Sequence, residues 1–350
     1  MYHFLYIVII NHDITMTKKP NLKTLAQAAG VSVPTASQVM RGTGRISEET
    51  RKKVLKAAER LHYVPDGRAA SMRSGEKREI GMLIHRISNP FNAEVISGVS
   101  DHLEGHGYLV SILDSRDDVQ HQKKNLEAFI RSSRGGLIWV PAHDTPKTTI
   151  DMLRTHSIPT VTFLRQSKFA QFDHIGLKNT EATYTATRHL IKLGHRRIVY
   201  FGGEPHSDVR QERIEGFKSA LKEYGIDQHV VWDAPDDKSS GVNELHQLLN
   251  QHPDTTALIC NGDMIALGAC FALQKTGKAP GKDLSIIGFD DVQDAALATP
   301  ALSTISTHPY ELGTLLAKTI LDRIADPLQP VKTSLIETQL ILRETTAPAT

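Results

Sequence analysis

Basic residues are concentrated near the start of the chain. Between Met16 and Ser74, twelve lysines and arginines stand against four acidic residues, which gives this segment a net charge of +8. The 350-residue chain as a whole carries only +2, so the other residues together carry −6. A small basic segment on a mildly acidic body is typical of a chain that binds a polyanion. A solvated basic surface without a partner is the alternative that charge alone leaves open.

The residue types that enzymes use are present, but they do not form a known catalytic pattern. The sequence contains no GxGxxG, no Walker A loop and no GxSxG. His102 and His106 in HLEGH are spaced i, i+4, but their order differs from HExxH, so we expect a helix surface there. Cys260 and Cys270 lie in apolar surroundings without a CxxC pattern, which predicts buried free thiols in a reducing cytoplasm. We therefore expect no enzymatic activity, no cofactor and no metal site.

The basic segment has the pattern of three short helices. An apolar i, i+3, i+4, i+7 spacing runs from Leu22 to Ala29, and Gly30 then ends this helix because glycine adopts the left-handed conformation easily. Ser32 is a good N-cap for a second helix with Pro34 in its first turn, and Ser47 caps a third helix. This arrangement predicts a helix-turn-helix domain whose second helix enters a major groove. A three-helix bundle without a DNA role is the alternative.

This segment resembles the DNA-binding headpiece of the lactose-repressor (LacI/GalR) family. The stretches AGVS, ISEETRKKV and LHYVP match the family pattern in order and at close spacing. The resemblance implies that Val33 and Pro34 begin the recognition helix and that Gln38 reads a base, because glutamine can bind adenine bidentately. The other DNA-binding residues that we expect, most of them at phosphate-contacting positions, are Thr24, Ser32, Thr35, Ser37 and Arg41.

The stretch PDGRAASMRSG, residues 65–75, matches the hinge helix of the same family. Such a helix is too short to be stable alone and is expected to become ordered on DNA. The resemblance implies that Met72 takes the place of a leucine that wedges into the minor groove and kinks the site. Asp66 and Gly67 depart from the pattern and weaken hinge folding, because one adds a carboxylate near phosphates and the other has low helix propensity. A plain flexible linker is the alternative.

The domain boundaries follow from these patterns. We expect a DNA-binding domain over 16–64, a hinge over 65–76 and an effector-binding and dimerisation domain over 77–350. The first fifteen residues contain an apolar run, Phe4–Ile10, that is too short to span a bilayer and lacks the features of a signal peptide. Because MTKKPNLKTL looks like a natural start, we expect residues 1–15 to be disordered or to come from an over-extended start assignment.

From Ile80 onward, apolar runs of strand length alternate with amphipathic segments. The first set is IGMLI, YLVSIL, GGLIWV and IPTVTFL, and the second is RRIVYFGG, HVVWD, TALICNG and LSIIGFDD. This alternation predicts an α/β fold with two doubly wound parallel-sheet subdomains. We expect the first subdomain over about 77–176 and 308–331, and the second over about 177–307 and 332–345. Ligands in such folds bind outside the carboxyl ends of the strands.

The body is similar to the periplasmic-binding-protein-like core of the same family. The stretches NPFNAEVISGV, HLIKLGHRRIVYFGG, ALICNGDMIALGA and LSIIGFDD carry this resemblance. It implies that Arg213 and Asp290 hold sugar hydroxyls, which suits a bidentate guanidinium and an acceptor carboxylate. It also implies that Phe91 and Tyr310 offer aromatic faces to the ligand. Positions that depart from the family pattern are Asn92 in place of an aromatic residue, Leu164 in place of an aspartate, Gly262 in place of the asparagine before Asp263, and Trp139 in a pocket wall.

These departures leave the class of ligand open. A neutral sugar is the first expectation, and a phosphorylated sugar or another anion held by Arg165 and Arg213 is the second. Each of these site residues has an alternative role in the core or at the rim of the pocket.

The patterns together predict a ligand-responsive transcriptional regulator, most simply a repressor. Two headpieces would bind the half-sites of a near-palindromic operator, so we expect a homodimer. Effector binding in the interdomain cleft would shift the subdomain orientation and the hinge spacing. The C-terminal LILRETTAPAT shows no leucine heptads, so no tetramerisation coil is expected. A solute-binding protein would lack the basic segment, and a sugar-processing enzyme would need a catalytic constellation that the sequence does not show.

Overall fold

The computed structural model describes residues 19–65, 78–132, 134–169 and 171–349. The chain divides into two compact units, Met1–Glu76 and Lys77–Thr350, which we describe separately. Residues 1–15 lie outside the described residues. So do Asp66, Gly67 and Met72 of the expected hinge.

The first unit is a bundle of three helices around a small apolar core, as the sequence predicts. The helices are α1 (Leu22–Ala29), α2 (Val33–Arg41) and α3 (Glu48–Arg60). Gly30 ends α1 with a left-handed φ of 64°, and Ser32 Oγ accepts a hydrogen bond from the Thr35 amide at 3.2 Å to begin α2. The fully or almost fully buried residues of this core are Leu25, Ala26, Ala36, Val39, Val54, Ala57 and Ala58.

Ser32→Ala should destabilise α2 by about 1 kcal/mol, because the N-cap hydroxyl satisfies a helix amide that alanine leaves unpaired. We expect faster hydrogen exchange at the Thr35 amide and unchanged exchange in the second unit. Ser37→Ala is the matched control, since this serine lies inside α2, where alanine is a better helix former. Equal protection of Thr35 in both variants would contradict the capping role.

The first sheet of the second unit is wholly parallel, with strand order β11-β5-β4-β3-β1-β2. Its strands are β1 (Glu79–Ile84), β2 (Leu109–Asp114), β3 (Gly136–Trp139), β4 (Thr160–Phe163), β5 (Asp173–Leu177) and β11 (Thr333–Ile336). Helices α5 (Pro90–Glu104) and α13 (Pro309–Ala325) contribute to the core on one face. Helices α6 (Val119–Arg131) and α7 (Lys147–Thr155) cover the other face.

The second sheet has strand order β12-β10-β9-β8-β6-β7 and is parallel except for β12. Its strands are β6 (Ile198–Phe201), β7 (Val230–Trp232), β8 (Ala257–Cys260), β9 (Ser285–Asp290), β10 (Ser303–Ser306) and β12 (Gln339–Ile341). Helices α8 (Asn179–Lys192) and α9 (Asp208–Glu223) pack on one face. Helices α10 (Lys238–Gln251) and α11 (Asp263–Lys275) pack on the other, and the short α12 (Gln293–Leu297) follows β9.

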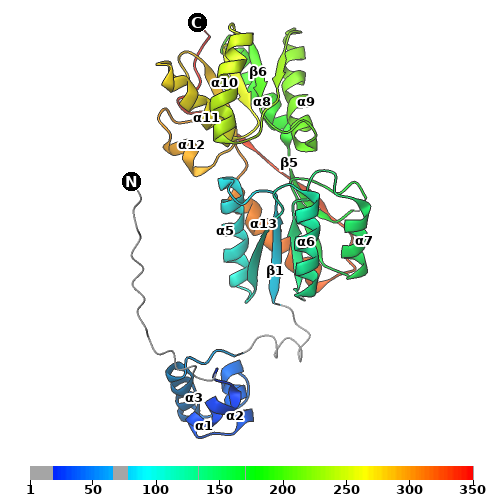
Figure 1. Cartoon of the computed structure of the whole chain (residues 1–350), viewed down its shortest axis with the longest axis vertical. Helices are drawn as coiled ribbons and strands as arrows, with labels where there is room; N and C mark the ends of the chain where they lie inside the picture. The colour runs from blue at the N-terminus through cyan, green and yellow to red at the C-terminus, as the bar shows by residue number, and fades with distance from the viewer. Residues whose placement is uncertain (1–18, 66–77, 133, 170, 350) are drawn as a thin grey trace, which may run out of the picture. The chain divides into compact units, whose positions relative to one another are not determined.

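The chain passes three times between the two subdomains: after β5, after β10 and after β11 (Figure 1). The last of the three expected boundaries, at 331/332, is wrong, because β11 pairs with β5 in the first sheet. Asp173 explains this placement. It accepts two hydrogen bonds from Arg323 of α13, at 2.7 and 2.9 Å, and one from the Lys332 amide at 2.9 Å. This buried ion pair anchors the segment that leads into β11.

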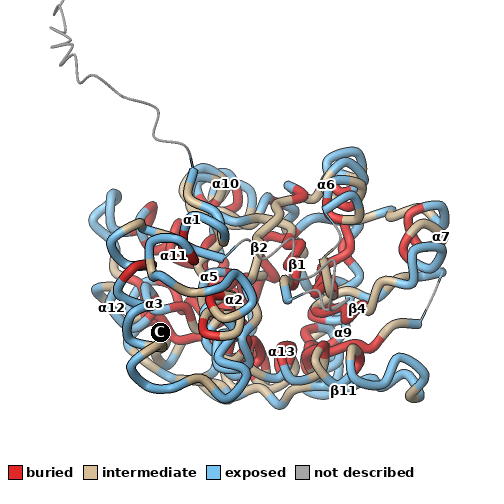
Figure 2. Tube along the Cα trace, turned by 90° about the horizontal axis from the view of Figure 1, so that it is seen from below, coloured by how far each residue is buried: buried red, intermediate tan, exposed pale blue. Residues whose placement is uncertain are grey.

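Burial follows the sheets and the inward helix faces (Figure 2). Both cysteines are buried free thiols, as predicted. None of the helices in the described residues is long and apolar enough to cross a membrane. Within the same residues, no group of three or more His, Cys, Asp or Glu side chains is arranged to hold a metal ion.

Candidate functional site

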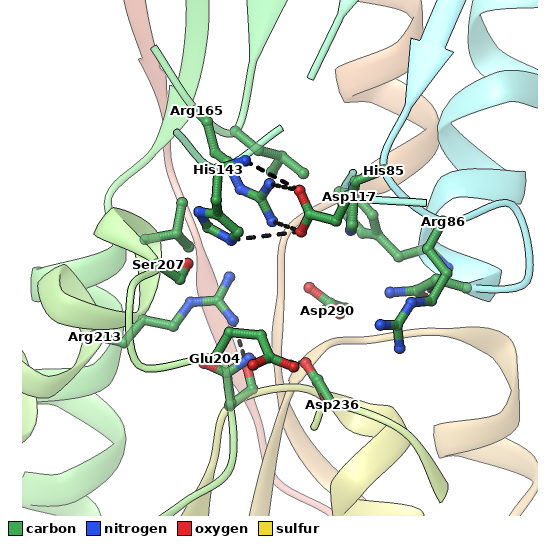
Figure 3. A pocket seen from close by; sticks show the side chains of 15 residues that line it. His85, Arg86, Asp117, His143, Arg165, Glu204, Ser207, Arg213, Asp236 and Asp290 are labelled. Carbon is green, nitrogen blue, oxygen red and sulfur yellow. Dashed lines mark hydrogen bonds and ion pairs between the residues drawn. The ribbon is translucent and has the colours of Figure 1, made fainter. Parts of the chain in front are cut away.

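A pocket lies between the two subdomains of the second unit, at the carboxyl ends of the strands (Figure 3). Its volume is about 110 Å³, several times the space that one water molecule needs. The first subdomain contributes His85, Arg86, Asn89, Phe91, Asp117, His143, Leu164 and Arg165. The second subdomain contributes Glu204, Ser207, Val209, Arg213, Asp236, Asn261 and Asp290.

Arg213 of α9 is held rigidly at one wall of the pocket. Its Nε donates to Asn179 Oδ1 at 3.0 Å, and its Nη1 donates to the Asn261 carbonyl. The guanidinium also lies 3.5 Å from the centroid of the Phe289 ring. A guanidinium fixed in this way can present its remaining N–H groups to a ligand in a constant orientation.

Asp290 is a nearly buried pocket carboxylate without a hydrogen-bond donor among the described residues. It ends β9, is 9 % exposed, and has a φ of 115° that turns the chain away from the strand. Among the described residues, none donates a hydrogen bond to its side chain. Burial raises the pKa of Asp290 well above its ordinary value, although the nearby Arg213 acts in the opposite direction. Its carboxylate oxygens are open to the pocket, where a ligand hydroxyl can donate to them.

Arg165 is already neutralised within the protein. Its Nη1 and Nη2 donate to the two carboxylate oxygens of Asp117, at 2.6 and 2.9 Å. Burial opposes ionisation of Asp117, but the hydrogen bonds and charge of Arg165 lower its pKa overall. His143 Nε2 lies 3.4 Å from the same carboxylate. Burial lowers the pKa of the adjacent His85 to about 3, so that ring remains neutral at physiological pH.

Five of the nine expected effector residues do not line the pocket, and two of these five lie well away from its lining. Trp139 is fully buried against α6 and α7, because side chains alternate along the strand and Trp139 therefore lies on the opposite face from Ile138 and Val140. Its Nε1 donates a hydrogen bond to Gln122 at 3.0 Å. Tyr310 is 43 % exposed, and its hydroxyl donates to Asp101 of α5 at 3.0 Å. Both assignments to the pocket are therefore corrected.

The other three are buried and support the pocket from behind. Asn92 Nδ2 donates to the carbonyl of Arg86 at 2.7 Å, which fixes the loop that carries Arg86. Asp263 accepts from the Thr304 hydroxyl at 2.5 Å and from the Val292 amide at 2.9 Å, and burial raises its pKa to about 7. Gly262 is buried directly beside Asp236. Phe91, Arg165, Arg213 and Asp290 do line the pocket, as expected.

Ten pocket residues were missed by the sequence reasoning. Many of them follow a predicted strand directly, so the rule that ligands bind at strand carboxyl ends could have found them. His85 and Arg86 follow IGMLI, His143 comes shortly after GGLIWV, and Asn261 follows the strand in TALICNG. The missed residues are His85, Arg86, Asn89, Asp117, His143, Glu204, Ser207, Val209, Asp236 and Asn261.

The expected DNA-binding residues of the first unit cluster at α2 and the turn before it. Val33 is 40 % exposed although it is apolar, which is consistent with a contact surface at the start of the helix. The Gln38 side chain lies over the loop at Gly44, and Arg41 Nε donates to the Ser37 carbonyl at 3.2 Å. Thr24 forms a capping box with Asn21 at the start of α1. Exposed or half-exposed residues in this set are Thr24, Ser32, Val33, Pro34, Thr35, Ser37, Gln38 and Arg41.

Comparison with known proteins agrees with this organisation. Residues 21–66 match the model of bacterial regulatory proteins of the lacI family, and residues 187–346 match a periplasmic binding protein-like domain. The chain is 33 % identical to the ribose operon repressor of Haemophilus influenzae over 92 % of this chain and 97 % of that protein. The chain belongs to the lacI family, whose members are DNA-binding transcriptional repressors and not enzymes.

Solved structures confirm the predicted fold class. A LacI family regulator from Enterococcus faecium with bound ribose is 27 % identical, with a TM-score of 0.71 over 78 % of this chain and all of that one. The lac repressor dimer bound to operator and the anti-inducer ONPF is 24 % identical, with a TM-score of 0.80 over 94 % of this chain and all of that one.

Proposed function

We propose that this protein is a homodimeric repressor whose affinity for a near-palindromic operator changes when a neutral sugar binds between the subdomains. The observation that supports this class of ligand is the Asp290 carboxylate, which is nearly buried, has no hydrogen-bond donor among the described residues and lines the pocket with Arg213. A fixed acceptor next to a fixed guanidinium is complementary to adjacent hydroxyls, which both accept and donate hydrogen bonds.

The charges of the pocket favour a neutral ligand over the phosphorylated alternative. Arg165 is paired with Asp117, and Arg213 is engaged with Asn179 and the Asn261 carbonyl. Three further carboxylates, Glu204, Asp236 and Asp290, line the pocket against two cations: Arg86, and Arg213, whose hydrogen-bond partners are neutral. A phosphate would therefore meet a surplus of negative charge. D-ribose is the first probe, because the Haemophilus influenzae relative is a ribose operon repressor and the Enterococcus faecium regulator has ribose bound.

The DNA-binding role rests on the basic helix-turn-helix unit. In our proposal, Val33, Pro34 and Gln38 of α2 reach base edges, while Thr24, Thr35, Ser37 and Arg41 contact phosphates and Ser32 caps the helix. Met72 would insert into the minor groove from the hinge. Homodimerisation would match the two half-sites of the operator. This role places the protein in the bacterial cytoplasm, where its DNA is.

Calorimetric titration of the full-length protein tests the ligand class. The panel contains D-ribose, other neutral mono- and disaccharides, and D-ribose 5-phosphate. We expect at least one neutral sugar to bind, and to bind at least about tenfold more tightly than its phosphate ester, a difference of about 1.4 kcal/mol. Binding of phosphate esters alone would contradict the proposal and would support the alternative in which Arg165 and Arg213 hold an anion.

A further inference from the structure

Gly262, which lies behind the pocket lining, is directly beside Asp236, which lines the pocket. Gly262 has extended backbone dihedrals, φ −151° and ψ 172°, which any residue can adopt. However, a Cβ atom at this position would lie 2.4 Å from Asp236 Oδ2 and 2.9 Å from Oδ1. Limited space, and not backbone conformation, therefore favours glycine here, because a larger residue would displace the Asp236 carboxylate. The Asp236 carboxylate occupies that space.

Asp236 also caps the helix that begins next to Gly262. An N-cap side chain normally accepts a hydrogen bond from the second or third amide of its helix. Gly262 is the N-cap residue of α11 and has no side chain to do so. Asp236 Oδ1 accepts from the amide of Ile265, the third residue of α11, at 3.4 Å. Asp236 belongs to the loop between β7 and α10, and its carboxylate occupies the space that a polar side chain at 262 would fill. The dipole of α11 favours a negative charge at this end of the helix.

The same carboxylate faces the pocket. Its Oδ2 accepts from Asn261 Nδ2 at 2.8 Å, and Asn261 Oδ1 in turn accepts from the Tyr200 hydroxyl at 2.9 Å. A carboxylate has about four acceptor positions, and the hydrogen bonds found in the described residues use two of them. Figure 3 shows Asp236 on the same side of the pocket as Asp290, with Arg86 approaching from the other subdomain.

We propose that Asp236 is a specificity-determining residue of this pocket. It takes the place of a polar side chain at 262 and accepts hydrogen bonds from hydroxyls of a neutral sugar, while its charge repels a phosphate ester of that sugar. This inference rests on the proposed function, because it assigns the discrimination between sugar and sugar phosphate to one residue of the same site.

A double-mutant cycle on the full chain tests whether the two residues compete for one space. Gly262→Asn should lower the melting temperature by several degrees, because the new side chain collides with the carboxylate. Asp236→Ala should lower it less. In Gly262→Asn/Asp236→Ala, the asparagine fits the vacated space and caps α11, so the double variant should melt above Gly262→Asn alone. Additive losses would overturn the proposal.

Ligand titrations test the specificity itself. For the neutral sugar that the wild type binds, Asp236→Asn should weaken binding about 30-fold. It should also reduce the preference for that sugar over its phosphate ester at least about tenfold. Asp254→Asn is the matched control, an exposed carboxylate paired with Arg197 before β8, at the end of the sheet away from the pocket. Unchanged binding in Asp236→Asn overturns this inference alone, whereas a wild type that binds no neutral sugar overturns the proposed function.

Discussion

Asp290→Asn is expected to lower the affinity for the neutral sugar several-hundred-fold. The amide keeps the shape of the carboxylate but loses its charge and one of its two acceptor oxygens. Hydrogen bonds to a charged group contribute about 1.5–3 kcal/mol each, against about 0.5–1.5 kcal/mol for neutral ones. The loss of one bond to a sugar hydroxyl and the weakening of the other to a neutral bond therefore amount to roughly 3–4 kcal/mol. Calorimetric titration of the full chain with the sugar measures this loss. Asp254→Asn, whose carboxylate is exposed and lies outside the pocket lining, should bind like the wild type.

Without ligand, Asp290→Asn should retain more stability than the wild type as the pH rises, although it binds the sugar more weakly. Because burial raises the folded-state pKa of Asp290, the folded protein binds this proton more tightly than the unfolded chain does. The resulting stabilisation is fully present below about pH 4, the ordinary pKa of aspartate, and is lost as the pH rises through the folded-state pKa. Asparagine does not ionise, so Asp290→Asn should lose stability less steeply between pH 5 and pH 9.

Thermal unfolding across this pH range therefore separates a ligand-binding role from a structural one. Asp263, whose pKa burial raises to about 7, contributes a decline of the same sign in both proteins, so the slope should shrink and not vanish. A variant that loses both sugar affinity and stability at pH 8 would show that Asp290 supports the fold. In that case, its assignment as the hydroxyl acceptor would be wrong.

Arg41→Glu should weaken DNA binding about 100-fold at physiological salt. Arg41 is exposed at the end of α2, and among the described residues its side chain donates a hydrogen bond only to the Ser37 carbonyl, so the charge reversal leaves the helix core intact. Each phosphate contact adds about one unit to the salt dependence of binding, and a glutamate there also repels the backbone. Because a phosphate contact carries no sequence information, affinity should fall equally on selected and unrelated duplexes.

Fluorescence anisotropy with the full chain and a duplex selected from a random pool measures this effect. Lys56→Glu supplies the same charge reversal on α3, where the lysine is exposed and borders a shallow groove with the end of α1. Sugar affinity should be unchanged in both variants. Equal losses of DNA affinity in Arg41→Glu and Lys56→Glu would mean that net charge, and not the α2 surface, determines binding.

The sequence predicts the fold well where apolar patterning is strong. The three headpiece helices and eight strands are confirmed, because caps such as Ser32 and buried runs such as LSIIGFDD are local signals. The strands DHIGL, STIS, TSLI and QLI were missed. They are short and partly polar, and partners distant in sequence stabilise them. The Asp173–Arg323 ion pair, for example, joins residues 150 positions apart.

The pocket was predictable only in part. Arg213 and Asp290 follow from the resemblance to the family, but the direction of a side chain depends on which face of a strand or helix it occupies. Trp139 and Ile138 are neighbours in sequence, yet they lie in different cores. Contacts between side chains of different loops could not be predicted from the sequence either. The residues around Arg165 do not indicate that Asp117 neutralises it, and those around Gly262 do not indicate that Asp236 fills the space beside it. These contacts decide the charge of the pocket and therefore the class of ligand.

The central claim is that sugar binding and DNA binding are coupled in one molecule. The most direct test is the affinity of the full-length protein for its selected duplex, measured with and without a saturating concentration of the neutral sugar. Allosteric coupling is typically about 1–3 kcal/mol, so we predict a change of about 5- to 150-fold, and no change in Asp290→Asn at the same sugar concentration. Sugar binding in the wild type without any change in DNA affinity would contradict the account.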